Sequence, residues 1–384
     1  MHKRMIFRVG LQASFPLVLA MVLFGCGNSS QHPIPSTSQP EFLYEAEANQ
    51  ILTFTINPST GALSNPTAIA GPNTLFGASM AADPAGKFLF ASDGQGNAID
   101  VFSINAGNGA LTAANGSPFP AGNLGFSGVL VTDTTGGFLY DAGVLGIAGF
   151  NVNAATGALT SIGGSPFLST GGSFGIIADP SGKFLYTPNL IGNPQATISG
   201  FAIDSSNGAL APIPGSPFPT QVSSLSLGIA VHPSGKFLYA GVGGLSSVVE
   251  GWAIDATTGA LTTTVPGSPF TLGNAPNPFI SSIAIAPNGK LLYVQGPPGT
   301  IYGFTVDGTS GALTPMSGSP FPLLAGRPLI IDPSGQFMYS PFLSTIYGIN
   351  IDAATGALTP MDGSPFPTGI PLTFPAGLTI VRIP

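Results

Sequence analysis

Residues 175–210 contain the pattern that decides the fold: GIIADPSGKFLYTPNLIGNPQATISGFAIDSSNGAL. Its short apolar runs, rich in β-branched and aromatic residues, are typical of β-strands. The first two runs are separated by Asp179-Pro180-Ser181-Gly182, in which proline presets φ and glycine takes the left-handed position of a tight turn. A second tight turn, Asp204-Ser205-Ser206-Asn207-Gly208, follows the third run and leads into a fourth. The stretch therefore predicts one unit of four antiparallel strands, numbered one to four along the chain.

The same unit recurs along the sequence. The tripeptide Gly-Ala-Leu begins at Gly61, Gly109, Gly157, Gly208, Gly259, Gly311 and Gly356. Four-stranded units repeated every 40–50 residues or so are typical of β-propeller blades. An aromatic residue also recurs at one position of strand two in every unit, which favours packing between neighbouring blades. The sequence predicts an all-β fold, a seven-bladed β-propeller of four-stranded blades.

The composition agrees with this class. The chain holds 54 glycines and 38 prolines, only 7% charged residues and 43% hydrophobic ones. So much glycine and proline disfavours a mostly helical fold. The apolar content disfavours disorder, because it can bury a large core.

The two ends of the repeat region predict how the ring closes. The first unit starts at Phe42-Leu43-Tyr44, which matches strand two, so its own strand one is missing. The last residues, Gly377 to Arg382, match a strand one and then the chain stops. We expect the C-terminal strand to complete the first blade.

The N-terminus has the pattern of a targeting signal. Basic residues and an apolar stretch lead to Leu23-Phe24-Gly25-Cys26, which resembles a bacterial lipobox. The alternative is an uncleaved membrane anchor, although the stretch is short for a span. We expect residues 1–25 to be a lipoprotein signal peptide, residues 26–40 a flexible tether with lipidated Cys26, and residues 41–384 the propeller. This places the protein in a bacterial cell envelope, lipid-anchored on the periplasmic or extracellular side.

The charge balance indicates which classes of partner the protein can bind. Without residues 1–25 the chain would keep six basic and sixteen acidic side chains, a formal charge of −10. Nucleic acid is therefore not an expected partner, because phosphate binding needs clustered lysine and arginine. Contact with the membrane is expected only through the lipid anchor, and the protein is expected to be a monomer.

The recurring Asp-Pro-Ser-Gly-Lys-Phe-Leu-Tyr and Asp-x-x-Thr-Gly-Ala-Leu phrases resemble the seven-bladed lactonase family. This family includes the propeller-type 6-phosphogluconolactonases and grades into YVTN-type repeat proteins. The resemblance covers about residues 41–384, and it implies a propeller and, as one possible activity, lactone hydrolysis at the mouth of the central channel. The shared phrases are turn and packing elements, so they carry no catalytic groups themselves.

The candidate site residues lie on the face opposite the tight turns. Glu45 and Glu47 follow the aromatic residue of strand two in blade one, and Asp93 and Asp141 follow it in blades two and three. These four carboxylates could share one sector and bind a cation, most plausibly Ca²⁺. Alternatively, one of them, such as Glu45, could have a raised pKa and act as a general base. The remaining interpretation is a set of solvated loop acids.

Arg327 precedes strand one of the last blade, near the predicted channel mouth. In a lactonase, an arginine there could polarise the lactone carbonyl or hold a carboxylate. It could also pair with Glu45 or Glu47 once the ring closes. The three histidines fall in the signal, the tether and a tight turn, which excludes Ser-His-Asp and Cys-His catalysis and histidine-based zinc sites.

Two functions are consistent with these observations. The first is an envelope lipoprotein whose propeller binds a protein or glycan partner, which the scarcity of catalytic groups favours. The alternative is a hydrolase of a sugar lactone or another neutral lactone, with Arg327 and Glu45 as its reactive residues. The sequence leaves open whether the protein is an enzyme.

Overall fold

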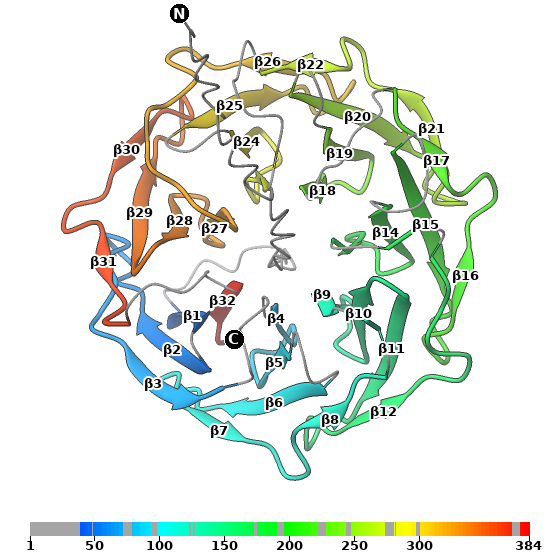
Figure 1. Ribbon diagram of the computed structural model, residues 1–384. Coiled ribbons are helices and arrows are strands. Elements are labelled where there is room, and N and C mark those ends of the chain that lie inside the picture. Colours follow the sequence, from blue (N-terminus) through cyan, green and yellow to red (C-terminus); the bar gives the residue numbers. More distant parts are fainter. Residues whose placement is uncertain are drawn as a thin grey trace, which may run out of the picture.

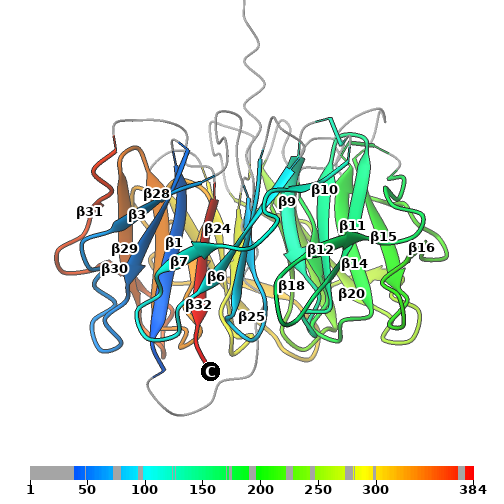
Figure 2. The same ribbon diagram turned by 90° about the horizontal axis from the view of Figure 1, so that it is seen from below.

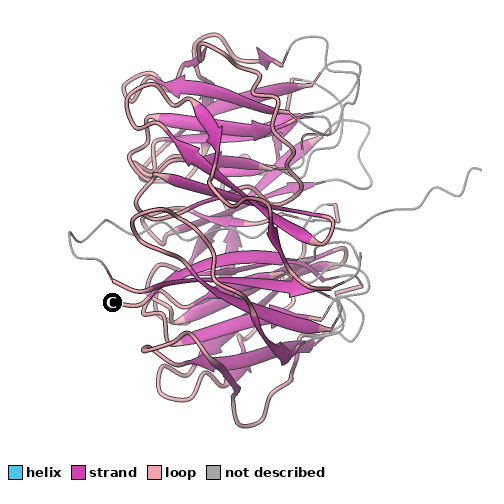
Figure 3. Cartoon of the chain, turned by 90° about the vertical axis from the view of Figure 1, so that its left-hand side faces the viewer, coloured by secondary structure: helices cyan, strands magenta, loops and turns pink. Residues whose placement is uncertain are grey.

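The computed structural model describes residues 39–384, apart from residues 48, 72–78, 94–97, 123, 126, 170, 173–174, 190–195, 222–227, 243–246, 273–279, 281, 297–299 and 371–376. The described residues form seven antiparallel sheets arranged as a ring around a central axis (Figure 1). Outside these strands the described chain consists of turns and loops (Figure 3). The predicted all-β, seven-bladed propeller is confirmed.

Within each blade the strands follow one another from the innermost, beside the central axis, to the outermost. Blade one consists of β32 (Gly377–Arg382), β1 (Glu41–Glu47), β2 (Gln50–Thr55) and β3 (Thr67–Ala70). Blade two consists of β4 (Met80–Ala82), β5 (Phe88–Ser92), β6 (Ala98–Ile104) and β7 (Leu111–Ala113), with β8 (Phe119–Pro120) also paired to β6. Blade three consists of β9 (Ser127–Thr132), β10 (Phe138–Gly143), β11 (Gly146–Val152) and β12 (Leu159–Ser161).

The remaining blades have the same order of strands. Blade four consists of β13 (Ile177–Ala178), β14 (Phe184–Asn189), β15 (Thr197–Ile203), β16 (Leu210–Pro212) and β17 (Phe218–Pro219). Blade five consists of β18 (Ile229–Val231), β19 (Phe237–Val242), β20 (Val248–Ile254), β21 (Leu261–Thr264) and β22 (Phe270–Thr271). Blade six consists of β23 (Ile283–Ile285), β24 (Leu291–Gln295), β25 (Ile301–Val306) and β26 (Leu313–Pro315). Blade seven consists of β27 (Ile330–Ile331), β28 (Phe337–Phe342), β29 (Thr345–Ile351), β30 (Leu358–Pro360) and β31 (Phe366–Pro367).

The C-terminal strand closes the ring, as predicted. β32 pairs antiparallel with β1 from Glu41 opposite Arg382 to Ala46 opposite Gly377. It also contacts β27 of blade seven on one side and β4 of blade two on the other. The first and last segments of the propeller are thus joined by a full strand pairing.

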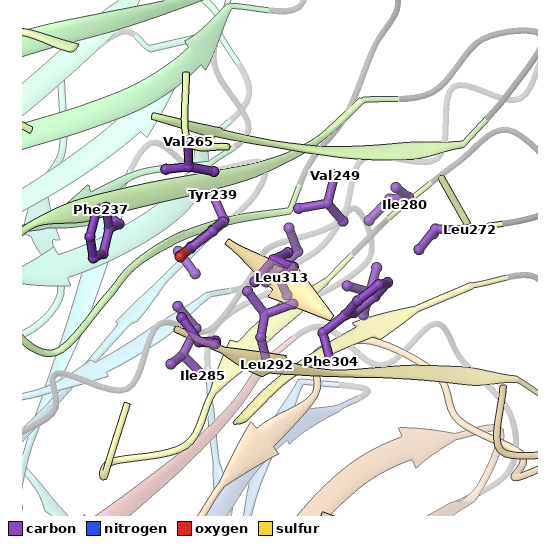
Figure 4. Packing of buried hydrophobic residues seen from close by; sticks show 14 residues of the cluster. Phe237, Tyr239, Val249, Val265, Leu272, Ile280, Ile285, Leu292, Phe304 and Leu313 are labelled. Carbon is purple, nitrogen blue, oxygen red and sulfur yellow. The ribbon is translucent and has the colours of Figure 1, made fainter. Parts of the chain in front are cut away.

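The aromatic residue of strand two connects each blade to the next. Tyr239 is fully buried, and its hydroxyl donates a hydrogen bond to the Gly311 carbonyl of the following blade at 2.7 Å. Around it, Phe237, Leu292 and Phe304 pack between blades five and six (Figure 4). The same tyrosine-to-glycine bond occurs in six blades, at Tyr44–Gly109, Tyr140–Gly208, Tyr186–Gly259, Tyr239–Gly311, Tyr293–Gly356 and Tyr339–Gly61. The two repeated phrases of the sequence therefore meet at the interfaces between blades.

The Gly-Ser-Pro-Phe phrases occupy the outer edge of the blades. In blade four the Ser216 hydroxyl accepts a hydrogen bond from the Gly200 N–H at 3.0 Å, and Phe218 packs close to Gly200. The hydroxyl thus satisfies a backbone donor of strand three between the short pairings with β16 and β17.

The ring has two different faces (Figure 2). The tight turns after strands one and three lie on the face at which β32 ends, which we call the turn face. The connections from strand two to three, and from each blade to the next, lie on the opposite face, which we call the loop face. Innermost strands begin at the loop face, so residues just before them lie around the channel mouth there. The described part of the chain has no helix that could cross a membrane.

Candidate functional site

The aspartates of the tight turns on the turn face are used within those turns. Asp179 accepts backbone hydrogen bonds from Ser181, Lys183 and Phe184 at 2.8–3.0 Å. Asp255 accepts them from Thr258 and Thr257, which lower the pKa of its carboxyl. These acids cap turns, as their spacing in the sequence indicates.

His232 also belongs to a tight turn. Its side chain is buried, with Nε2 2.8 Å from the Gly289 carbonyl oxygen and Nδ1 2.8 Å from the Ser234 hydroxyl. Burial lowers the pKa of His232. Its location on the turn face keeps it away from the channel mouth of the loop face.

Glu45 and Glu47 lie on one side of β1, toward the loop face. Glu45 is opposite Leu52 of β2 and Leu378 of β32. Both leucines pack with Tyr339 of blade seven. Because directly paired residues point to the same side of a sheet, Glu45 faces the interface between blades one and seven. Glu47 is two residues further on and faces the same way.

This carboxyl pair has an unusual environment. Both glutamates are fully buried. Among the described residues, no hydrogen bond reaches either carboxylate oxygen of Glu45. Burial, with a contribution from neighbouring Glu47, raises the pKa of Glu45 well above its usual range. Glu45 therefore holds its proton to a higher pH than an exposed glutamate does.

A third glutamate of β1 lies at the turn face. The Glu41 Oε1 is 2.9 Å from Arg382 Nε of β32. Burial and the nearby Asp332 raise the pKa of Glu41 to about 7, against the opposing effect of Arg382. Arg382 is thus engaged at the strand that closes the ring, at the opposite end of β1 from Glu45.

The other two predicted carboxylates belong to blades two and three. Asp141 is fully buried and lies opposite Ala148, which packs against blade two. Asp93 is half-buried at the end of β5 and adds to the raised pKa of Asp100, which arises mainly from burial. The structure thus brings Glu45 and Glu47 together but does not gather all four acids. Within the described ranges, no three His, Cys, Asp or Glu side chains are grouped closely enough to hold a metal ion.

Arg327 is half-buried on the loop-face segment that leads into β27. The residue takes part in at least one hydrogen bond, ion pair, ring contact or electrostatic interaction with its surroundings. The fully buried neighbours of its segment include Ser340, whose hydroxyl donates to the Gly326 carbonyl at 3.0 Å. The arginine is therefore held at the start of the innermost strand of blade seven, the blade that Glu45 faces.

Sequence reasoning missed two acids of strand three, one buried and one half-buried. Glu250 of β20 is fully buried and accepts a hydrogen bond from the Gln221 N–H at 2.9 Å. Asp100 of β6 occupies the same position of its blade. Aligning the units would have found both, because the equivalent residues elsewhere carry no charge: Leu52, Ala148, Ser199, Tyr302 and Tyr347. Cys26 lies outside the described residues.

Comparisons with known proteins agree with this architecture. A family model described as "Lactonase, 7-bladed beta-propeller" matches residues 28–124 and 176–373. No curated protein matches the sequence.

Solved structures show the same fold at low sequence identity. A protein of Bacteroides uniformis, provisionally assigned as a 6-phosphogluconolactonase, has a TM-score of 0.68 and 20% identity over 90% of this chain and 100% of its own. A similarly assigned protein of Bacteroides fragilis has a TM-score of 0.66 and 21% identity, covering 91% of this chain and 100% of its own. The periplasmic gluconolactonase of Pseudomonas aeruginosa has a TM-score of 0.68 and 16% identity, covering 90% and 100%.

Proposed function

The chain belongs to the lactonase family of seven-bladed β-propellers, and from this premise we propose that it hydrolyses lactones at the channel mouth of the loop face. The observation that carries the proposal is the arrangement at the closing interface. Arg327 precedes the innermost strand of blade seven, and the buried Glu45–Glu47 pair of blade one faces the same blade. The sequence alone favours a binding role over lactone hydrolysis. Family membership supports the hydrolase, so we place hydrolysis first.

Hydrolysis of a lactone needs few groups. The oxygen of water forms a bond to the carbonyl carbon, and the carbonyl electron pair moves onto its oxygen. The tetrahedral intermediate then expels the ring oxygen, which takes up a proton to give a hydroxy acid. A guanidinium at the carbonyl oxygen stabilises the charge of the intermediate. We assign this role to Arg327.

We assign the proton transfer to the Glu45–Glu47 carboxyl pair. When ionised, a carboxylate whose pKa is raised is a stronger base near neutral pH. Burial and Glu47 raise the pKa of Glu45 in this way. Glu45 is fully buried, so in this proposal the proton of the attacking water reaches it through an intervening water rather than by direct contact with the lactone.

The charge balance favours a neutral substrate. The chain has sixteen acidic and nine basic residues, and all lysines after residue 8 lie in the tight turns of the turn face. A phosphorylated lactone would bring two negative charges to a mouth with one assigned cation. A neutral sugar lactone avoids this repulsion, and we propose it as the substrate class.

The test is the release of acid from a panel of neutral aldonolactones incubated with the protein. We expect wild-type hydrolysis to fall at least about 100-fold in Arg327→Ala, the cost typical of losing one oxyanion donor. It should also fall in Glu45→Gln. Glu250→Gln is the matched control, because Glu250 is an equally buried carboxyl in blade five, across the ring. Failure of wild type to release acid above the uncatalysed rate would refute the proposal, as would full activity in Arg327→Ala.

A second candidate function, binding of a protein partner, is favoured by one observation. Among the described residues, the exposed large hydrophobic side chains are four leucines on loop-face connections: Leu145, Leu168, Leu324 and Leu343. Two of them lie at blade three and two at blades six and seven, and exposed apolar patches are typical of interaction sites. In this alternative the protein is the lipid-anchored envelope protein that its N-terminus predicts.

The binding proposal has its own test. A photoreactive amino acid at Leu343 should cross-link a defined protein in cells of the source organism, whereas one at Thr160 should not. Thr160 is exposed on the outer strand β12, away from the leucines. Equal cross-linking from both positions, or none from Leu343, would contradict a loop-face partner.

A further inference from the structure

The segment that carries Arg327 is held by buried side chains from two blades. The Gln295 Nε2 donates a hydrogen bond to the Ala325 carbonyl at 3.0 Å. The Ser340 hydroxyl donates to the Gly326 carbonyl at 3.0 Å, and the Ser282 hydroxyl accepts from the Leu329 N–H at 3.0 Å. All three side chains are buried. Backbone groups on both sides of the arginine are therefore fixed by buried side chains.

The path of this backbone is further restricted at Gly326. A Cβ atom at this position would lie 1.8 Å from the Pro341 carbonyl oxygen, far inside van der Waals contact. Only glycine permits so close an approach of the segment to β28. The residue before Arg327 is thus fixed against blade seven, while Gln295 and Ser282 fix its flanks to blade six.

Two of the three hydrogen bonds belong to the repeat itself. In blade four the Thr187 hydroxyl donates to the Gly175 carbonyl at 2.7 Å, as Ser340 does to Gly326. In blade two the Ser79 hydroxyl accepts from the Leu130 N–H of the next blade at 3.0 Å, as Ser282 does from Leu329. Neither of those segments carries an arginine, so the same bonds there hold backbone only, whereas those of Ser340 and Ser282 hold the segment that carries Arg327.

Gln295 is different. It follows the strand-two tyrosine of its blade by two residues, and the equivalent residues of the other blades are all short: Ala46, Ser92, Ala142, Pro188, Gly241 and Pro341. Its long side chain reaches across the interface between blades to the Ala325 carbonyl, two residues before Arg327. The long amide thus occurs in the blade that borders the Arg327 segment.

We infer that Gln295, together with Ser340, is a positioning residue that holds Arg327 where its guanidinium meets the carbonyl oxygen of the lactone. This inference rests on the proposed hydrolysis. A cation fixed in advance stabilises the developing oxyanion without reorganising during the reaction. Because Arg327 is the one cation assigned to the intermediate, displacement of its segment weakens the step at which water adds to the carbonyl carbon.

The test compares variants that remove one hydrogen bond each. Gln295→Met keeps the length of the side chain but has no donor, and Ser340→Ala removes the hydroxyl. Thr187→Val is the matched control, because it removes the same kind of bond in blade four. We expect kcat/KM for a neutral aldonolactone to fall about tenfold or more in Gln295→Met and Ser340→Ala, mainly through kcat, at thermal stabilities similar to that of Thr187→Val. Ser340→Thr, which retains the hydroxyl, should restore activity.

A second readout does not depend on hydrolysis. Phenylglyoxal modifies exposed guanidinium groups, and peptide mapping reports the rate at Arg327 relative to Arg382 in the same sample. We expect the relative rate at Arg327 to change at least threefold in Gln295→Met and to stay unchanged in Thr187→Val. If wild type hydrolyses no lactone, the proposed function fails. The relative modification rate at Arg327 then tests by itself whether Gln295 positions the arginine. If Gln295→Met and Ser340→Ala leave both kcat/KM and the relative rate as in wild type, the inference is overturned.

Discussion

The hydroxyl of Tyr339 donates a hydrogen bond to the carbonyl oxygen of Gly61 at 2.6 Å, joining residues 278 positions apart. Tyr339 lies in strand two of blade seven, and Gly61 starts the Gly-Ala-Leu phrase of blade one. The bond that links neighbouring blades elsewhere thus also crosses the point where the ring closes. Beside β32, it is a second connection between the two ends of the propeller.

Removing this hydroxyl should destabilise the protein measurably. In Tyr339→Phe the Gly61 carbonyl loses a buried donor, which we expect to lower the free energy of unfolding by about 1–2 kcal/mol. Equilibrium unfolding in denaturant measures the change. Tyr347→Phe, at a half-buried ring on β29, is the control and should change stability by less than about 0.5 kcal/mol. Equal effects of the two substitutions would show that the closing hydrogen bond has no special weight.

Blade two offers the opposite experiment. Phe90 occupies the position of the strand-two tyrosine and is fully buried, but it has no hydroxyl for Gly157 of blade three. Phe90→Tyr should add the missing hydrogen bond and raise the free energy of unfolding by up to about 1 kcal/mol. The same denaturant titration measures it. A loss of stability would mean that this interface is packed too tightly for the repeat geometry.

Glu41 makes stability depend on pH between about 4.5 and 7. Burial and Asp332 raise the pKa of Glu41 to about 7 in the folded protein, against an ordinary value of 4.5. Between these values the unfolded chain releases the proton that the folded protein keeps, so the contribution of Glu41 to stability is greatest below pH 4.5 and is lost as pH rises to 7. The loss amounts to about 3 kcal/mol at most. Glu45 adds a change of the same sign, because burial raises its pKa too.

Unfolding measured at pH 5 and pH 7.5 tests this prediction. Glu41→Gln has no proton to lose at this position, so its stability should fall less than that of wild type over the interval. Asp204→Asn is the control, since Asp204 is an exposed turn acid whose pKa is lowered by Ser206. It should show the wild-type decrease. A decrease of wild-type size in Glu41→Gln would rule out this carboxyl as the cause.

The fold was predictable because its determinants are local. The Gly-Ala-Leu and Asp-Pro-Ser-Gly turns can be found in the sequence alone, and the missing strand one before Phe42 predicts the closure. The site was less predictable, because residues that follow the same strand of successive blades point into different interfaces. Glu45 and Asp141 are equivalent in the repeat, yet one faces blade seven and the other blade two. The role of Gln295 depends on an Ala325 carbonyl thirty residues away, which no spacing indicates.

The closing strand β32 should still complete blade one when it is moved to the start of the chain. Leu43 lies opposite Ile380 in blade one, as Leu185 lies opposite Ala178 in blade four. In blade four the segment Asp179 to Lys183 joins the two strands. A permuted chain made of residues 377–380, Asp-Pro-Ser-Gly-Lys and residues 42–370 would therefore give blade one the same covalent turn in the same register. Its innermost strand would then be joined by a short loop, whose closure costs less entropy than that of the whole chain.

We expect the permuted chain to unfold cooperatively, at a midpoint no lower than that of residues 39–384. The matched comparison is a chain that ends at residue 376, in which the inner edge of β1 loses its partner and Leu378 and Ile380 leave the interface with blade seven. Burying a leucine or isoleucine side chain contributes about 1.5–3 kcal/mol, so this chain should lose several kcal/mol. Thermal unfolding followed by circular dichroism compares the three proteins. A truncated chain as stable as residues 39–384 would show that β32 does not hold the ring closed, and an unfolded permuted chain would show that closure depends on the order in which the blades are connected.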